Sequence, residues 1–174
     1  MKALVVYDTA YGNTARIAEA IARGIGPDAH VHSIRTLAAS DLPALDLLVV
    51  GSPTQGGRPT DMMMRWLKAL GPGRLEGIAA AAFDTRVRAD GRGLALRLLM
   101  KLMSYAAPRI ADALRAAGAR RVEGPEGFYV EGREGPLQAG EKERARAWGK
   151  ILAGQFPLAR TPEPLAMGQA ATGL

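Results

Sequence analysis

Hydroxyl, amide and glycine residues are concentrated in one short stretch near the N-terminus. The apolar run VVY at residues 5–7 is followed by Asp8-Thr9-Ala10-Tyr11-Gly12-Asn13-Thr14, and a helical pattern begins at once. The start of a helix offers unpaired backbone N–H groups and the positive end of the helix dipole. Thr9, Asn13 and Thr14 can add side-chain donors, and Gly12 lets the chain curl around an anion. The stretch therefore predicts a phosphate-binding loop.

This loop lacks the residues that mark two common nucleotide sites. It has no lysine and no G-x-x-x-x-G-K-[ST] pattern, which argues against a nucleoside triphosphate with magnesium. It has no G-x-G-x-x-G pattern either, which argues against the usual dinucleotide fold. A terminal monophosphate fits the loop best. The alternative is an ordinary helix start, capped by Asn13 and without a ligand.

Two further loops are predicted on the same rim. Residues 51–60, GSPTQGGRPT, follow a buried strand directly, and Gly56-Gly57 permits an uncommon backbone geometry or a close approach to a flat ligand. Residues 82–93, AFDTRVRADGRG, follow the next strand. Ligands of open parallel sheets bind beyond the carboxyl ends of the strands, so we expect the three loops to share one site. The alternative is a glycine-rich connection without a ligand.

Short apolar runs alternate with helical stripes along the chain. Strands are predicted at 2–7, 30–35, 46–50, 77–83 and 127–132. Helical stripes are formed by Ile17, Ala18, Ile21, Ala22 and Ile25, by Met63, Trp66, Leu67 and Leu70 after an N-cap at Thr60, and by Ala145, Trp148 and Leu152. This alternation is typical of an α/β fold in which right-handed crossovers build a parallel sheet.

The composition fits one globular domain with few special chemistries. The 174 residues are 48% hydrophobic and 23% charged, and we expect a domain over 1–154 followed by an irregular tail over 155–174. The chain has no cysteine, which excludes disulfides, thiolate nucleophiles and Cys-ligated metal centres. His30 and His32 have no acidic or histidine cluster near them in sequence, so we expect no metal site.

Charge and hydropathy indicate location and partners. No apolar run is long enough for a signal peptide or a membrane span, which predicts a cytoplasmic protein. The net charge of +6 and the pI of about 10.1 favour acidic partners or anionic surfaces. The arginines are scattered and have no aromatic platform, so we expect no nucleic-acid binding.

The three loops together resemble those of the flavodoxin family. Residues 9–14 are similar to the family's T-x-T-G-N-T phosphate loop, and residues 51–57 resemble the loop that lies against the isoalloxazine ring. Phe83-Asp84-Thr85-Arg86 stands in the place of the loop on the other side of the ring. The resemblance covers residues 1 to about 153. It implies a doubly wound, five-stranded parallel sheet ordered 2-1-3-4-5, with helices on both faces, and non-covalent flavin mononucleotide (FMN).

The resemblance also implies which residues hold the cofactor. The phosphate would be held by the loop Thr9, Ala10, Tyr11, Gly12, Asn13 and Thr14, and the ring by Pro53, Thr54, Gln55, Gly56 and Gly57, with Asp84, Thr85 and Arg86 near its pyrimidine end. The Gly56-Gly57 peptide would offer a carbonyl to the N5–H group of reduced flavin. No residue is assigned as catalytic, because the redox chemistry belongs to the flavin.

Two positions depart from the family pattern. Tyr11 stands where a hydroxyl side chain usually faces the phosphate, and Gln55 stands where many members place an aromatic ring against the flavin. The expected function is FMN-dependent electron transfer to a redox partner protein or a small redox substrate, as a shuttle or a small flavin reductase. The alternatives are an oxidoreductase for quinone- or porphyrinogen-type substrates, which an uncovered ring face would admit, and a flavin-free interaction module.

The segment GRGLALRLLMKLMSYAAP, residues 91–108, is not explained by the family core. Its narrow polar stripe and many leucines could contact a peripheral membrane surface, a partner or a second copy in a dimer. The alternative is a long helix that continues towards Ala117, is kinked at Pro108 and packs most of its leucines in the core.

Overall fold

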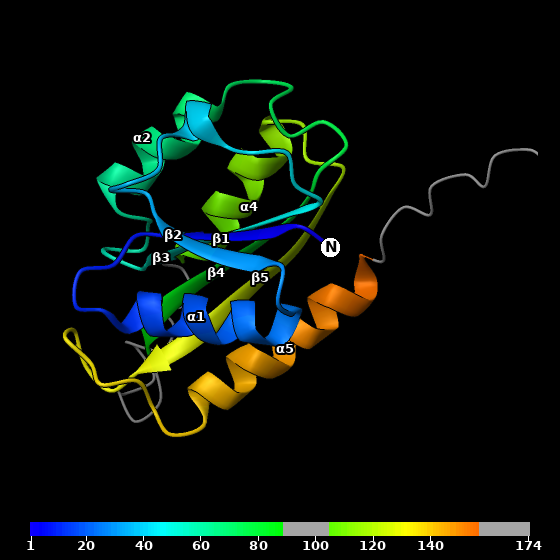
Figure 1. Ribbon diagram of the computed structural model, residues 1–174. Coiled ribbons are helices and arrows are strands. Elements are labelled where there is room, and N and C mark those ends of the chain that lie inside the picture. The colour runs from blue at the N-terminus through cyan, green and yellow to red at the C-terminus, as the bar shows by residue number, and fades with distance from the viewer. Residues whose placement is uncertain (89–104, 157–174) are drawn as a thin grey trace, which may run out of the picture.

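The computed structural model describes residues 1–88 and 105–156 (Figure 1). Its strands form one sheet in the order β2-β1-β3-β4-β5, and every neighbouring pair is parallel. The strands are β1 (Ala3–Tyr7), β2 (Ala29–Ser33), β3 (Leu47–Pro53), β4 (Ala79–Val87) and β5 (Arg121–Val130). The predicted doubly wound sheet ordered 2-1-3-4-5 is therefore confirmed.

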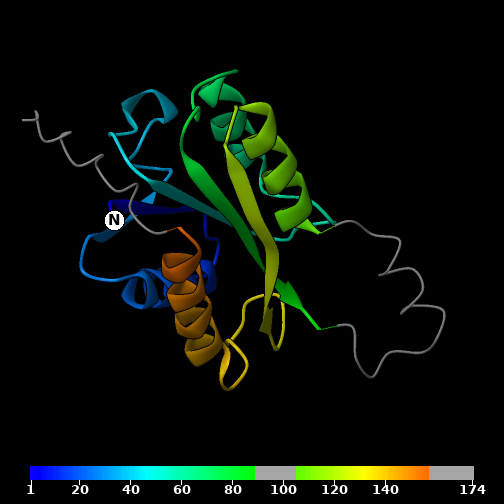
Figure 2. The ribbon, with the colours of Figure 1, turned by 90° about the vertical axis from the view of Figure 1, so that its right-hand side faces the viewer.

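Helices cover both faces of this sheet (Figures 1 and 2). One face carries α1 (Asn13–Ile25) and α5 (Glu141–Gln155), and the other carries α2 (Asp61–Leu70), α4 (Ala106–Ala116) and the short 3₁₀ turn η1 (Ala39–Asp41). Successive side chains of a strand point to opposite faces, so Val5 packs under α1 and α5 whereas Val6 packs under α2 and α4. The continuous apolar runs predicted as strands fill both cores in this way.

Helices α1 and α5 approach each other through two glycines. A Cβ atom added at Gly24 would lie 2.1 Å from the carbonyl oxygen of Arg146, and one added at Gly149 would lie 2.2 Å from that of Ile21. Only glycine allows the two backbones to pack at this distance. The sequence reasoning singled out neither glycine.

The helix starts agree with the sequence in one case and differ in another. The predicted N-cap at Thr60 is confirmed, because its hydroxyl oxygen accepts the N–H of Met63 at 3.1 Å. The alternative that placed an N-cap at Asn13 is wrong. The cap of α1 is Gly12, whose φ of 82° lies in the left-handed region that glycine adopts without strain.

Several predicted bounds are also wrong. Strands β3 and β4 extend into residues predicted as loop, because Ser52 pairs with Asp84 and Pro53 with Thr85. Strand β5 begins at Arg121 rather than 127; its first half is polar because it lies at the edge of the sheet.

The structure also differs from the alternative of a long helix that continues through a kink at Pro108. Helix α4 begins at Ala106, after Tyr105 in an extended conformation. Pro108 therefore lies in the first turn of α4, where a missing N–H breaks no intrahelical hydrogen bond.

Parts of three predictions lie outside the described residues. These are residues 89–93 of the third predicted loop, residues 91–104 of the apolar segment and residues 157–174 of the tail, so the membrane or dimer contact stays a prediction. None of the helices formed by residues 1–88 and 105–156 is long and apolar enough to cross a membrane.

Candidate functional site

A cavity of about 330 Å³ opens at the carboxyl ends of the central strands. This volume lies within the range of small-ligand pockets. Its walls come from the loop after β1, the end of β3 with its following loop, and the ends of β4 and β5. The lining residues are Thr9, Ala10, Tyr11, Asn13, Thr14, Pro53, Thr54, Gln55, Gly56, Thr85, Arg86, Val87, Val130 and Arg133.

The structure thus brings together residues from all three predicted loops. Among the predicted site residues, Gly12, Gly57 and Asp84 are not part of the lining. Sequence reasoning missed Val87, Val130 and Arg133. The two valines follow directly from the true strand ends, whereas no sequence motif marks Arg133.

Two buried hydroxyl groups meet at the wall of the cavity. The Oγ1 atoms of Thr14, in the first turn of α1, and Thr85, in β4, lie 2.9 Å apart. One hydrogen lies between the two oxygens, so the other hydroxyl hydrogen remains for a further acceptor. Both residues line the cavity, and this donor is therefore available to an anionic ligand oxygen beside the positive end of α1.

The rest of the first loop keeps further donors. Thr9 Oγ1 accepts the N–H of Gly12 at 2.9 Å, which leaves the hydroxyl hydrogen of Thr9 unused by this contact. The side-chain amide of Asn13 donates to the carbonyl oxygen of Glu134 at 2.9 Å and keeps a second hydrogen. One amide hydrogen of Asn13, which the sequence analysis assigned to a phosphate, is therefore used within the fold. The donor set as a whole suits a phosphate.

Asp8, which directly follows β1, fixes the position of this loop. Its carboxylate accepts the N–H of Thr9 at 2.9 Å and the hydroxyl of Thr60 at 2.6 Å, and Arg35 lies 3.4 Å away. Asp8 is buried, so these contacts replace its hydration. Sequence reasoning gave it no role, although a carboxylate directly after a buried strand was the available signal.

The second loop has the backbone geometry that the sequence predicted. Gly56 and Gly57 have φ values of 56° and 78°, and the backbones of Gln55 and Arg58 exchange hydrogen bonds of 2.9 and 3.2 Å across the turn. Gln55 and Gly56 are exposed at the mouth of the cavity. Tyr11, which is 47% exposed, lines the cavity from the first loop.

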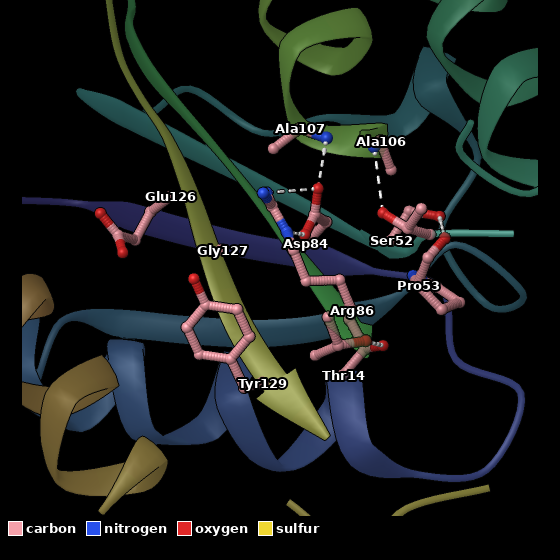
Figure 3. A network of polar contacts seen from close by, with 12 residues as sticks. Thr14, Ser52, Pro53, Asp84, Arg86, Ala106, Ala107, Glu126, Gly127 and Tyr129 are labelled. Carbon is pink, nitrogen blue, oxygen red and sulfur yellow. Dashed lines mark hydrogen bonds and ion pairs between the residues drawn. The ribbon is translucent and has the colours of Figure 1, made fainter. Parts of the chain in front are cut away.

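Two of the residues predicted near the ring hold the start of α4. The N–H of Ala106 donates to Thr54 Oγ1 at 3.1 Å. The N–H of Ala107 donates to a carboxylate oxygen of Asp84 at 2.9 Å (Figure 3). Asp84 is fully buried in β4. This burial raises its pKa, and the neighbouring Arg86 guanidinium opposes the rise.

Arg86 is held on three sides at the wall of the cavity. It makes two hydrogen bonds to Asp84, of 2.5 and 2.8 Å, and its guanidinium carbon lies 3.8 Å from the ring centroid of Tyr105. A Cβ atom at Gly127 would lie 2.4 Å from the same carbon, so the absence of a side chain there makes room for the guanidinium. Its charge is balanced by the buried carboxylate.

The part of the chain that the structure describes contains no candidate metal site. Within residues 1–88 and 105–156, no group of three or more histidine and acidic side chains is placed to hold a metal ion.

A parallel sheet ordered 2-1-3-4-5, with a ligand-sized cavity between the loops that follow its central strands, defines a protein with the flavodoxin-like fold. The sequence profile of the family described as Flavodoxin matches residues 5–148. The chain belongs to the flavodoxin family, whose members are electron-transfer flavoproteins that bind FMN.

Individual relatives agree with this membership. A flavodoxin from Aquifex aeolicus (strain VF5) is 35% identical over 91 residues, which cover 48% of this chain and 49% of that protein. The match thus spans about half the length of this curated relative. An archaeal flavodoxin superposes with a TM-score of 0.65 at 22% identity, covering 90% of this chain and 99% of its own. Oxidised flavodoxin 2 from Bacillus cereus gives 0.67 at 20% identity, covering 90% and 100%. At these sequence identities, the two structural matches show that the fold is shared.

Proposed function

We propose that this protein is an electron carrier that binds FMN non-covalently in the cavity at the carboxyl ends of β1, β3 and β4. The observation that carries this proposal is the hydroxyl pair of Thr14 and Thr85, which offers a spare hydrogen at the wall of the cavity, beside the start of α1. Family membership supports the choice of FMN. A cytoplasmic location, predicted from the sequence, is part of the proposal.

In this proposal each wall of the cavity has its own task. The phosphate would be bound by Thr9, Asn13 and the Thr14–Thr85 pair, with backbone N–H groups of the same loop other than that of Gly12, which donates to Thr9. The flavin ring would lie between the loop of residues 53–57 and the end of β4, where Arg86 faces the cavity. When bound, FMN supplies one- and two-electron redox chemistry. The chain's residues would hold and orient the cofactor.

A second candidate is a reductase for a small acceptor. The observation that favours it is the exposed Gln55 at the mouth of the cavity, where the ring would lack a covering aromatic side chain from this loop. Reduced protein that passes electrons to a soluble quinone, but not to redox proteins, would support the reductase. The opposite result would support the carrier.

The proposal is tested by titrating the apoprotein with FMN and with riboflavin, which lacks the phosphate, and following flavin fluorescence. We expect Thr14→Ala to weaken FMN binding about tenfold, since a hydrogen bond to a charged group is lost, and to leave riboflavin binding nearly unchanged. Thr36→Ala is the matched control, because the Thr36 hydroxyl donates to the backbone of Ser33, outside the cavity. Failure of the wild type to bind either flavin would contradict the proposal and favour the alternative of a flavin-free interaction module.

A further inference from the structure

The loop after β5 forms a tight turn with Arg133 at its tip. The N–H of Glu131 donates to the carbonyl oxygen of Pro136 at 2.9 Å, and the N–H of Gly135 donates to that of Gly132 at 3.1 Å. The second bond closes a β-turn whose central residues are Arg133 and Glu134. Arg133 is therefore presented by a hydrogen-bonded turn.

This turn is attached to the start of α1. The carbonyl oxygen of Glu134 accepts the side-chain amide of Asn13 at 2.9 Å. Gly135 packs directly on the same amide, since a Cβ atom there would lie 2.4 Å from Asn13 Nδ2. Arg133, next to Glu134 in the turn, lines the cavity together with Thr9, Asn13 and Thr14. The turn thus holds Arg133 on the side of the cavity that carries the predicted phosphate loop.

Arg133 and Arg86 both line the cavity, but they differ in whether an acidic side chain pairs with them. Arg86 is paired with the buried Asp84, and the first loop contributes no charged residue to the lining. Glu131 and Glu134 flank Arg133 in the sequence, yet Arg133 forms no ion pair with any residue among 1–88 and 105–156.

We infer that Arg133 is a phosphate-binding residue that makes this site selective for the phosphorylated flavin. The inference rests on the proposed function. The phosphate of FMN carries nearly two negative charges at pH 7, and a guanidinium presents a planar set of donors that matches phosphate oxygens. Neutral hydroxyl and amide donors would fix the position of the phosphate, and Arg133 would balance its charge. The positive charge at the phosphate would therefore come from the turn after β5, far in sequence from the phosphate loop.

The test measures dissociation constants for FMN and riboflavin with the full chain and three variants. We expect Arg133→Gln to weaken FMN binding about tenfold, to leave riboflavin binding unchanged and to reduce the salt dependence of FMN binding. Arg133→Lys should recover part of the loss. Arg120→Gln is the matched control, because Arg120 is exposed just before β5, at the end of the strand opposite Val130. Thermal unfolding of each variant confirms that it is folded.

The remaining outcomes separate the inference from the proposed function. If the wild type binds FMN and Arg133→Gln keeps the same ratio of FMN to riboflavin affinity, the inference is overturned and the proposed function stands. An equal loss for both flavins also overturns it, because the residue would then act on the ring or on the fold. If the wild type binds no FMN, the proposed function is contradicted, and with it the inference that rests on it.

Discussion

The buried carboxylate of Asp84 connects the cavity wall to the start of a helix. It pairs with Arg86, which lines the cavity, and accepts the N–H of Ala107 in the first turn of α4. Desolvation by burial is the main influence on this group, and it raises the pKa above the ordinary value of 3.8. The folded state therefore binds the Asp84 proton more tightly than the unfolded state does. Between the two pKa values, this group makes the free energy of unfolding fall as the pH rises.

Replacing Asp84 should change how stability depends on pH. Asp84→Asn removes the titrating group, so the stability of the wild type relative to the variant should be highest near pH 4 and should decline as the pH rises through the raised pKa. Urea unfolding of both proteins from pH 4 to pH 8 measures this difference. Thr36→Ala, which removes a hydroxyl group that does not titrate and that donates to the backbone of Ser33, should run parallel to the wild type. A parallel profile for Asp84→Asn as well would contradict the assigned direction of the pKa.

At the scale of elements, the contact between α1 and α5 depends on the two glycines that bring their backbones together. We expect Gly149→Ala to lower the free energy of unfolding by about 1–3 kcal/mol, because the new methyl group would meet the backbone of Ile21 and force the helices apart. Gly154→Ala lies in the same helix with no atom within 4 Å of the added carbon, and should raise stability by up to about 1 kcal/mol. Chemical denaturation of both variants makes the comparison. Equal effects would show that helix propensity, not the close approach, decides the outcome.

The elements also show which features a sequence pattern can predict. The centres of β1, β3 and β4 were predicted because they are buried on both faces and read as continuous apolar runs. The polar ends of β3 and β4 were missed, since Ser52 and Asp84 accept hydrogen bonds from the N–H groups of Thr60 and Ala107, which lie outside these strands. The three loops of the site were predicted because parallel strands end at one edge. Arg133 was not, because its placement depends on the contact between Asn13 and Glu134, 121 residues apart.

At the scale of the whole molecule, the net charge of +6 favours a negatively charged redox partner. Reduced, FMN-loaded protein should transfer electrons to an acidic acceptor protein faster at low ionic strength, with a rate that falls about tenfold or more between ~0.01 and ~0.3 M salt. A basic acceptor of similar potential should show the opposite trend, and a small neutral acceptor almost none. Stopped-flow absorbance at several salt concentrations gives the rates. A faster reaction with the acidic partner at high salt would refute this expectation.

The two tryptophans lie on opposite sides of the sheet. Trp66, in α2, is buried in the core and donates to the carbonyl oxygen of Leu37 at 2.8 Å, whereas Trp148, in α5, packs edge-on against Phe83 and Phe128. Each face of the sheet therefore has its own intrinsic fluorophore, in a different polar environment. The emission of the folded protein is a sum of two signals, one from each helical layer, and loss of packing on one face alone would alter only one of them. The chain thus carries an internal optical reporter of whether its two cores melt together.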